Sequence, residues 1–518
     1  MSNPDPEAPS RDPARSDAEH ARRRELDQSV ASGIAWTGGV RSLTQGVQWV
    51  AALLVVRLLT PEDYGLVAMA MAYLGLVQMF STFGLGAAIV QRQDLTKEQI
   101  ARLGGFSLLA GSVLALVSVI ASGLVASFFD EPRVQPIVLL LSVTFVLSGA
   151  GVIPRSLLKR DLNFKRLALI QAARNLTYSG SALSLAALGF SYWSLVIASL
   201  LGTCVGVFAA LVSRPHAITW PKEIESIRSE LWFGGHVVVT QLALYLRRFA
   251  DVLVVGRTLG TEALGIYNVG WTNANIPVER VTPIVTSVSA AVFAASQDSP
   301  TELRRYVKMF TEGIALLAFP ACFGLAVVAD DFVLLVFGER WMATVGPLRI
   351  LAIVGAMRSI TPVLSQVLIA TDQAKKNMQF AVAAAVTIPC LLLIGSRWGV
   401  SGVAAGWLIG HPTLVGAVLL RHTLRTTELS LRAYLASLSS ATMATGLLLI
   451  SVLVARTAMP EPWPLALRFG VQVGVGAVVY GLCIFAVYRR KLKSFMSFFR
   501  EARRTMPDAA LDDRSESS

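Results

Sequence analysis

Charged residues are scarce in this sequence: they make up 15% of its 518 residues, whereas hydrophobic residues make up 54% and the mean hydropathy is +0.57. This composition excludes a soluble protein. Apolar segments of about 20 residues recur along the chain, and each is long enough to cross a hydrocarbon core of about 30 Å as a helix. The sequence therefore predicts an all-α integral membrane protein.

Cysteine and histidine are also scarce, with four and five residues respectively. The cysteines stand alone in apolar surroundings, which is typical of small buried side chains rather than of disulfides or metal ligands. No histidine has a nucleophile or a metal partner at motif spacing. We therefore expect no metal, no cofactor and no enzymatic activity. The residues concerned are Cys204, Cys322, Cys390, Cys483, His20, His216, His236, His411 and His422.

The hydropathy pattern predicts about 14 transmembrane helices, arranged as two six-helix bundles and two further helices at the C-terminal end. Residues 1–28 are polar and lack an apolar core, so we expect a disordered cytoplasmic tail rather than a signal peptide. The other predicted regions are an N-terminal six-helix half (29–212), a cytoplasmic linker (213–230), a C-terminal six-helix half (231–424), two extra transmembrane helices (425–488), and a basic amphipathic segment with an acidic tail (489–518).

Basic residues give the chain a net charge of +12. Most of them fall in segments on one predicted side, such as Arg22 to Arg24, Arg155 to Arg166 and Arg489 to Lys491. By the positive-inside rule these segments face the cytoplasm, so we expect a multi-pass membrane protein with both termini cytoplasmic. The expected partners of this charge are membrane lipids and not nucleic acid.

One short stretch occurs twice, 200 residues apart. Residues 53–65 (LLVVRLLTPEDYG) match residues 253–265 (LVVGRTLGTEALG) without a gap. The six identical pairs are Leu53/Leu253, Val55/Val255, Arg57/Arg257, Leu59/Leu259, Glu62/Glu262 and Gly65/Gly265. Similarity at a fixed offset is typical of two homologous halves with the functional site between them. The alternative is that all membrane hairpins share this composition.

Seven arginines lie inside predicted spans: Arg41, Arg174, Arg247, Arg248, Arg280, Arg349 and Arg358. Each would cost about 2.5–3.5 kcal/mol at a lipid-facing helix centre, so most must face protein or a water-filled cavity. Only two acids, Asp251 and Glu279, lie comparably deep. The interior is therefore predicted to be cationic, which favours an anionic cargo.

Helical spacing predicts which faces line this cavity. Polar stripes comprise Arg41, Gln45 and Gln48 in the first span, and Asn268, Asn275 and Glu279 in the eighth. In the seventh span, Arg247 and Asp251 stand on one line and Arg248 on the next, so the two arginines cannot both face the cavity squarely. Arg41 and Arg247 are the main candidates for contact with the cargo, with Arg248 and Arg280 in support. The alternative is that Arg247 or Arg248 only neutralises Asp251 along the helix. Arg174 and Arg358 lie in spans with little other polarity, and Arg349 is expected to extend to the membrane surface.

Two stretches carry a resemblance to a known family. Residues 57–67 (RLLTPEDYGLV) with 83–91 (FGLGAAIVQ), and residues 251–260 (DVLVVGRTLG) with 264–267 (LGIY), resemble bacterial polysaccharide exporters. The group is that of the Wzx-type oligosaccharide flippases and the lipopolysaccharide or succinoglycan-type exporters of the multidrug/oligosaccharidyl-lipid/polysaccharide superfamily. The resemblance covers about residues 30–490 and is specific at these stretches.

The resemblance implies two six-helix bundles around a central cavity and the flipping of a polyprenyl-pyrophosphate-linked oligosaccharide by alternating access. An arginine fork matches phosphate oxygens, which would explain the cationic interior. The sugars would meet Gln45, Gln48, Asn268, Trp271 and Asn275, while Asp251 and Glu279 would respond to a coupling ion. A polymerase and glycosyltransferases of the same pathway are possible partners.

Three rival functions stay open. A lipid II flippase shares the fourteen-span plan and the cationic cavity. A drug/cation antiporter of the same superfamily typically has twelve spans and an acid in the first span, where this chain has Arg41. A membrane glycosyltransferase or polymerase would need long external loops, whereas the predicted loops are short.

Overall fold

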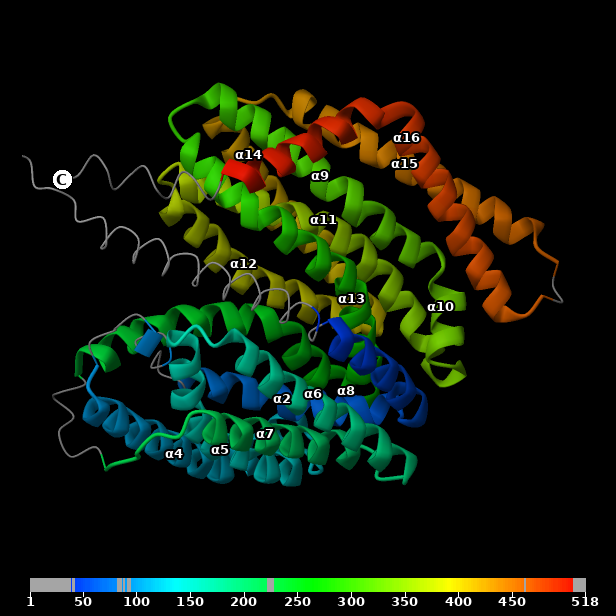
Figure 1. Ribbon diagram of the computed structural model, residues 1–518. Coiled ribbons are helices and arrows are strands. Elements are labelled where there is room, and N and C mark those ends of the chain that lie inside the picture. Colours follow the sequence, from blue (N-terminus) through cyan, green and yellow to red (C-terminus); the bar gives the residue numbers. More distant parts are fainter. Residues whose placement is uncertain are drawn as a thin grey trace, which may run out of the picture. The chain divides into compact units, whose positions relative to one another are not determined.

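The computed structural model describes residues 39, 42–81, 86, 89–90, 95–220, 228–460 and 463–505, and in 80–81, 228–248 and 487–505 it describes the backbone alone. All regular structure in these residues is helical (Figure 1). The α-helices are Ser42–Leu58, α2 (Pro61–Ser81), α4 (Lys97–Phe129), α5 (Val134–Arg160), α6 (Phe164–Ala187), α7 (Trp193–Ser213), α8 (Arg228–Ala295), α9 (Pro300–Val327), α10 (Ala329–Val336), α11 (Val345–Ala370), α12 (Ala374–Gly395), α13 (Gly399–Gly410), α14 (Ala417–Thr426), α15 (Leu431–Ala458) and α16 (Leu465–Thr505).

Nine helices among the described residues are long and apolar enough to cross a membrane. A further pair, Ser42–Leu58 and Pro61–Met79, passes the same test together and is bent by 119° at its break. The predicted all-α, multi-span membrane fold is confirmed at this level. The number of fourteen spans and the two-bundle repeat stay predictions.

Local sequence explains where several helices begin. Ser299 caps α9 by accepting a hydrogen bond from the backbone N–H of Glu302, and Pro300 occupies the first turn, where a missing N–H costs nothing. Asn163 caps α6 in the same way, through the N–H of Arg166. Ser430 caps α15.

Two long apolar stretches are interrupted by a glycine in a left-handed conformation. Gly260 has φ 84° and ψ −172°, so α8 consists of two helices, 228–259 and 261–295. Gly399 has φ 70° at the start of α13. A side chain would be strained at either position, because residues with a Cβ rarely adopt these angles.

The chain divides into two compact units. The first comprises Met1–Leu58, Leu74–Ser122 and Pro136–Thr240, and the second comprises Leu59–Tyr73, Gly123–Gln135 and Gln241–Ser518. The predicted domain boundaries stay predictions.

In the first unit, glycines let helix backbones approach closely. A Cβ added to Gly111 of α4 would lie 2.5 Å from the carbonyl oxygen of Phe145, and one added to Gly149 of α5 would lie 2.4 Å from that of Ser107. The Ser107 hydroxyl also donates to the Gly149 carbonyl at 3.0 Å. Small residues and such hydrogen bonds are the usual means of helix association in lipid, where apolar burial gives little driving force.

The core of the second unit lies between α9, α11, α14 and α15, with residues such as Phe310, Val367, Leu419 and Tyr434 buried together. Figure 1 shows α15 and α16 running beside α9. Polar contacts fix them there. Tyr480 of α16 donates its hydroxyl to the Leu316 carbonyl at 2.6 Å, and Ser440 of α15 donates to Glu312 at 2.6 Å.

Candidate functional site

Arg358, on α11 in the second unit, lies against two aromatic rings that also contact each other. Its guanidinium carbon lies 4.6 Å from the ring centre of Trp271 and 5.4 Å from that of Trp407. Nη1 donates a hydrogen bond to Oδ1 of Asn275 at 3.2 Å. A cation over an indole face is stabilised by about 0.5–2 kcal/mol, more where water is excluded. The rings thus replace part of the hydration that this cation would have in water.

The spacing along α8 places three side chains near Arg358 on one face of that helix. Tyr267, Trp271 and Asn275 follow each other at four-residue intervals, about one helical turn each. The Tyr267 and Trp271 rings stack with centroids 6.1 Å apart. Trp407, from α13, lies 5.1 Å from Trp271. The result is a continuous aromatic surface beside the cation.

A buried carboxylate completes this group. Asp251 is only 2% exposed and accepts hydrogen bonds from the Tyr267 hydroxyl at 3.0 Å and from the Val252 backbone N–H at 2.9 Å. It also interacts electrostatically with Arg358. We call the following six residues the Arg358 cluster: Asp251, Tyr267, Trp271, Asn275, Arg358 and Trp407.

The helix next to Trp407 is irregular. Residues His411–Gly416 form a single π-helical turn directly after α13. Its first residue, His411, is 6% exposed and shares a hydrogen bond of 3.0 Å between Nε2 and the Thr361 hydroxyl of α11. π-turns of this kind are frequent at functional sites. This one ties the helix that carries Trp407 to the helix that carries Arg358.

Chemically, the side chains of the Arg358 cluster are suited to binding a ligand through non-covalent contacts. Indole faces stack against the apolar faces of sugar rings, the Asn275 amide can hydrogen-bond hydroxyl groups, and a guanidinium pairs with phosphate or carboxylate oxygens. Among the described residues, no three His, Cys, Asp or Glu side chains converge to hold a metal ion. The pockets beside Arg166 and beside Arg421, of about 450 and 410 Å³, include no residue of this cluster.

The structure brings together three of the residues singled out from the sequence: Trp271, Asn275 and Asp251. Asn268 is half-buried on the same helix, whereas Glu279 and Arg280 are exposed further along α8. In the first unit Gln45 is half-buried, and Gln48 accepts a hydrogen bond of 3.4 Å from Asn175.

The cationic candidates named first are not tested. Arg41 lies outside the described residues, and Arg247 and Arg248 lie where only the α8 backbone is described. Arg349, for which extension to the membrane surface stays a prediction, pairs with Asp330 of α10. The stem of Arg174 packs against Gly206 of α7.

Sequence reasoning set Arg358 aside and did not name Tyr267 or Trp407. Arg358 was set aside because α11 carries little other polarity, but its partners come from α8 and α13, 83 residues before it and 49 after it in the chain. One signal was available. Tyr267 and Trp271 stand on the same helical stripe as Asn275, so an aromatic face beside a polar one was visible in the sequence.

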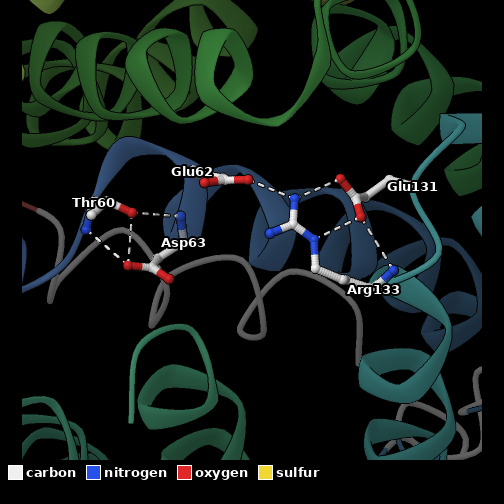
Figure 2. A network of polar contacts seen from close by, with 5 residues as sticks. All are labelled: Thr60, Glu62, Asp63, Glu131 and Arg133. Carbon is white, nitrogen blue, oxygen red and sulfur yellow. Dashed lines mark hydrogen bonds and ion pairs between the residues drawn. The ribbon is translucent and has the colours of Figure 1, made fainter. Parts of the chain in front are cut away.

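A second polar network surrounds the repeated turn (Figure 2). Thr60 and Asp63 form a reciprocal cap at the start of α2: the Thr60 N–H donates to Asp63 at 2.9 Å and the Asp63 N–H donates to the Thr60 hydroxyl at 3.3 Å. Arg133 pairs with Glu62 at 2.5 Å and with Glu131 at 2.8 Å. These bonds raise the pKa of Arg133 and lower that of Glu131.

Among the described residues, the second unit thus combines helices long and apolar enough to cross a membrane with a cation packed on aromatic faces. The model of the polysaccharide biosynthesis protein family matches residues 54–346, which is more than half of the chain. The chain therefore belongs to the polysaccharide biosynthesis protein family. This confirms the resemblance to polysaccharide exporters that the two stretches carry.

Individual relatives agree with this assignment. The chain is 26% identical to the lipopolysaccharide biosynthesis protein WzxC of Escherichia coli K12, over 74% of this chain and 79% of that one. It is 26% identical to the teichuronic acid biosynthesis protein TuaB of Bacillus subtilis, over 89% and 96%. Its fold matches that of the lipid II flippase MurJ in an inward closed conformation, with a TM-score of 0.72 over 88% and 99% of the two chains at 16% identity.

Proposed function

We propose that this protein is a flippase that moves a polyprenyl-pyrophosphate-linked oligosaccharide across the bacterial inner membrane by alternating access. The cargo would be a unit of a capsule, an exopolysaccharide or an O-antigen. Family membership supports this, as do the names of two relatives, which place them in lipopolysaccharide and teichuronic acid biosynthesis. Membrane lipids and the polymerase and glycosyltransferases of the same pathway are the proposed partners.

The observation that carries the proposal is Arg358 packed against the paired rings of Trp271 and Trp407 inside the membrane-spanning part of the second unit. An arginine in the membrane-spanning part is energetically costly, and residues of this kind usually mark a functional site. Indole faces suit sugar rings, and the planar guanidinium suits phosphate oxygens. A lipid-linked oligosaccharide contains both groups in one molecule.

We propose that Arg358 acts together with the residues predicted from the sequence. The proposed cargo contacts are Arg358, Arg41, Gln45, Gln48, Arg247, Arg248, Asn268, Trp271, Asn275 and Arg280. Asp251 and Glu279 are proposed as the coupling acids. For Asp251, the support is its burial against Tyr267 and its interaction with Arg358: a proton or cation at Asp251 would weaken its attraction for the guanidinium and leave that cation to the cargo.

We further propose fourteen spans, with both termini cytoplasmic. Each of the following helices fits a separate crossing of the membrane: the two on either side of Gly260, the two on either side of Gly399, the two of the bent pair (42–58 and 61–79), and α6. With the remaining helices of sufficient length, this gives fourteen. An even number places both ends on one side, which the basic clusters indicate to be the inner side.

The first experiment follows the cargo in cells that lack the gene. A membrane-impermeant sugar probe applied to intact and lysed cells reports on which leaflet the lipid-linked oligosaccharide lies. Completed intermediates confined to the cytoplasmic leaflet, and moved outward again by the reintroduced gene, are the expected result. Intermediates that still reach the outer leaflet, or that are incomplete, would contradict a flippase and favour an antiporter or an enzyme. Trapped lipid II in place of the oligosaccharide would identify the lipid II flippase instead.

The same assay tests the site. We expect Arg358→Gln to lower outward transport about tenfold or more, because it removes the cation from both indole faces. Arg358→Lys should retain part of the activity, since it keeps the charge but not the planar fork. The matched control is Arg432→Gln, an exposed arginine of α15. Equal activity of Arg358→Gln and the control at equal protein levels would remove Arg358 from the cargo site.

A further inference from the structure

Two pockets lie outside the Arg358 cluster, one in each unit. The first has a volume of about 450 Å³ and lies between α6 and α7 of the first unit. Leu169 and Val212 are 46% and 66% exposed, so the pocket opens on an apolar face of the helix pair, which acyl chains cover in a membrane. We call it the Arg166 pocket, and its walls are Arg166, Leu169, Ile170, Ala173, Ala209 and Val212.

Arg166 places a positive charge at one end of this apolar pocket. It stands in the first turn of α6, and its Nη1 donates a hydrogen bond of 3.1 Å to the carbonyl of Ser213, the last residue of α7. A guanidinium has five N–H donors, so others stay available to a ligand. The acid nearest to Arg166 in the sequence, Asp161, pairs with Arg214 at 3.0 Å. Among the described side chains, no acid forms an ion pair with Arg166.

The second unit has a pocket of about 410 Å³ with the same character. We call it the Arg421 pocket, and it is lined by Ala417, Val418, Arg421, His422 and Arg425 of α14. Here too the nearest acid in the sequence, Glu428, pairs with another arginine, Arg304. Neither Arg421 nor Arg425 forms an ion pair with an acid whose side chain the structure describes. Both pockets therefore combine an apolar wall with arginines that have no acid partner among the described residues.

The helix pairs that carry the two pockets are equivalent, at an offset of 210 residues. α6 and α12 begin 210 residues apart. The turns before them contain left-handed residues at the same distance, Leu162 with φ 52° and Asp372 with φ 56°. The turns after them do so again, with Gly189 at φ 83° and Gly399 at φ 70°. Each helix pair is therefore built by the same sequence of turns.

This equivalence extends to the pockets themselves. Ile170 of α6 and Val212 of α7 line the Arg166 pocket. At 210 residues further on stand Phe380 of α12 and His422 of α14, whose rings contact edge-on with centroids 4.8 Å apart. His422 in turn lines the Arg421 pocket. A pocket with an arginine at the same place in both units favours a ligand site over a local packing defect.

An apolar wall that ends at an arginine matches a molecule with a hydrocarbon chain and an anionic head. A guanidinium donates paired hydrogen bonds to phosphate oxygens, and the inner leaflet is rich in anionic lipids. The proposed orientation places both pockets at the cytoplasmic side, because they lie beside basic clusters. Two separate pockets, neither sharing a residue with the Arg358 cluster, suit a component that surrounds the protein better than one cargo molecule on a single path.

We propose that each pocket binds an anionic phospholipid of the cytoplasmic leaflet. One acyl chain lies along the apolar wall, and the phosphate accepts hydrogen bonds from Arg166 in the first unit or from Arg421 and Arg425 in the second. The proposal goes beyond the proposed function, because it assigns no step to the transport and holds whatever the cargo is.

Native mass spectrometry of the purified full-length protein in detergent counts the bound lipids. We expect two tightly bound molecules of phosphatidylglycerol, and about tenfold weaker binding of phosphatidylethanolamine, which has no net charge. Arg166→Gln should retain one phosphatidylglycerol, as should Arg421→Gln combined with Arg425→Gln, and all three substitutions together should retain none. The matched control is Arg432→Gln, at an exposed arginine outside both pockets. Equal counts in these variants and the control, or equal affinity for the two lipids, would overturn the proposal.

A second substitution tests the apolar wall without a change of charge. Ala173→Phe fills the Arg166 pocket and should also leave one bound phosphatidylglycerol. Ala436→Phe, at an exposed alanine of α15, is its control and should retain two. Two lipids bound to Ala173→Phe would show that no acyl chain occupies the pocket and would overturn the proposal. Since the arginine and alanine substitutions alter different atoms, a variant that fails to fold leaves the other to decide.

Competition distinguishes a phospholipid from the lipid part of the proposed cargo. Polyprenyl phosphate, added in an amount equal to the phosphatidylglycerol, should leave both phospholipids bound. Its replacement of them in the native protein, with the loss of that replacement in Arg166→Gln, would assign the pocket to the cargo and overturn the proposal.

Discussion

At the scale of single residues, an arginine in a membrane-spanning helix must exchange its water for protein contacts. Arg358 does so with two indole faces, one amide oxygen and a nearby carboxylate. Arg349, nine residues earlier on the same helix, does so with the carboxylate of Asp330. One residue type thus has two environments on α11: Arg349 is bound in an ion pair, and Arg358 lies against two indole rings.

His216 gives a prediction about pH. It lies in the segment after α7, next to Gly104 of α4, and burial lowers its pKa from the ordinary value, offset in part by a backbone hydrogen bond at Arg214. A histidine with a lowered folded-state pKa stabilises the fold above its unfolded pKa, about 6.5, and this contribution is lost as the pH falls through the folded-state value. The Thr219 N–H, which donates to the Ala101 carbonyl at 3.2 Å, reports on this docking.

We therefore expect the hydrogen-exchange protection of Thr219, corrected for intrinsic rates, to drop below about pH 6.5 in the native protein. His216→Gln should show no such step. His422→Gln, at a histidine of α14 in the second unit, serves as the control. The same pH profile in all three proteins would rule out His216 as the cause.

At the scale of elements, the short helix α10 joins several long ones. Asp330 accepts hydrogen bonds from Arg349 of α11 and from Arg456 of α15, the latter at 3.1 Å. The neighbouring Asp331 accepts from Gln472 of α16 at 2.5 Å. Two adjacent acids thus attach the last two long helices to the helix that carries Arg358.

Asp330→Asn should loosen this attachment. Two arginines lose their anionic partner, and because the pairs are partly exposed we expect a loss of about 1–2 kcal/mol in stability. Thermal unfolding of the purified protein in detergent measures the effect. Asp298→Asn, an exposed acid, is the matched control and should unfold at the native temperature. A native-like midpoint for Asp330→Asn would mean that these pairs do not stabilise the junction.

At the scale of the whole molecule, the distribution of charge predicts the orientation in the membrane. Single cysteines at two exposed positions test it: Glu262→Cys in the repeated turn and Lys375→Cys at the start of α12. In a cysteine-free background, a membrane-impermeant thiol reagent should label the first in spheroplasts and the second only after lysis. The opposite pattern would reverse the orientation, and labelling of both in spheroplasts would contradict the span assignment between them.

Much of the fold and part of the site were predictable. Apolar length and low charge predicted helical membrane spans, and periodicity placed Asn275 on a polar face of the 261–295 helix. Trp271 was indicated only by the family resemblance. The surroundings of Arg358 were not predictable, because a lone arginine in an apolar helix looks alike in sequence whether it pairs with an acid, as Arg349 does, or packs against indole rings. Residues 65 and 265 are both glycine in the two copies of the repeat, but the sequence does not indicate that each glycine packs against the other copy.

The sequence by itself determined the class of protein. The burial of long apolar segments and the energetic cost of charge in the membrane depend on composition and on short-range periodicity, and both can be read from the sequence. It also determined the family, through two short stretches. Only the tertiary structure decided which polar groups meet, because those contacts join residues of α8, α11 and α13 far apart in the chain. Their distances depend on how helices cross, and that is set by close backbone approaches such as Gly65 on Thr261 rather than by any local pattern.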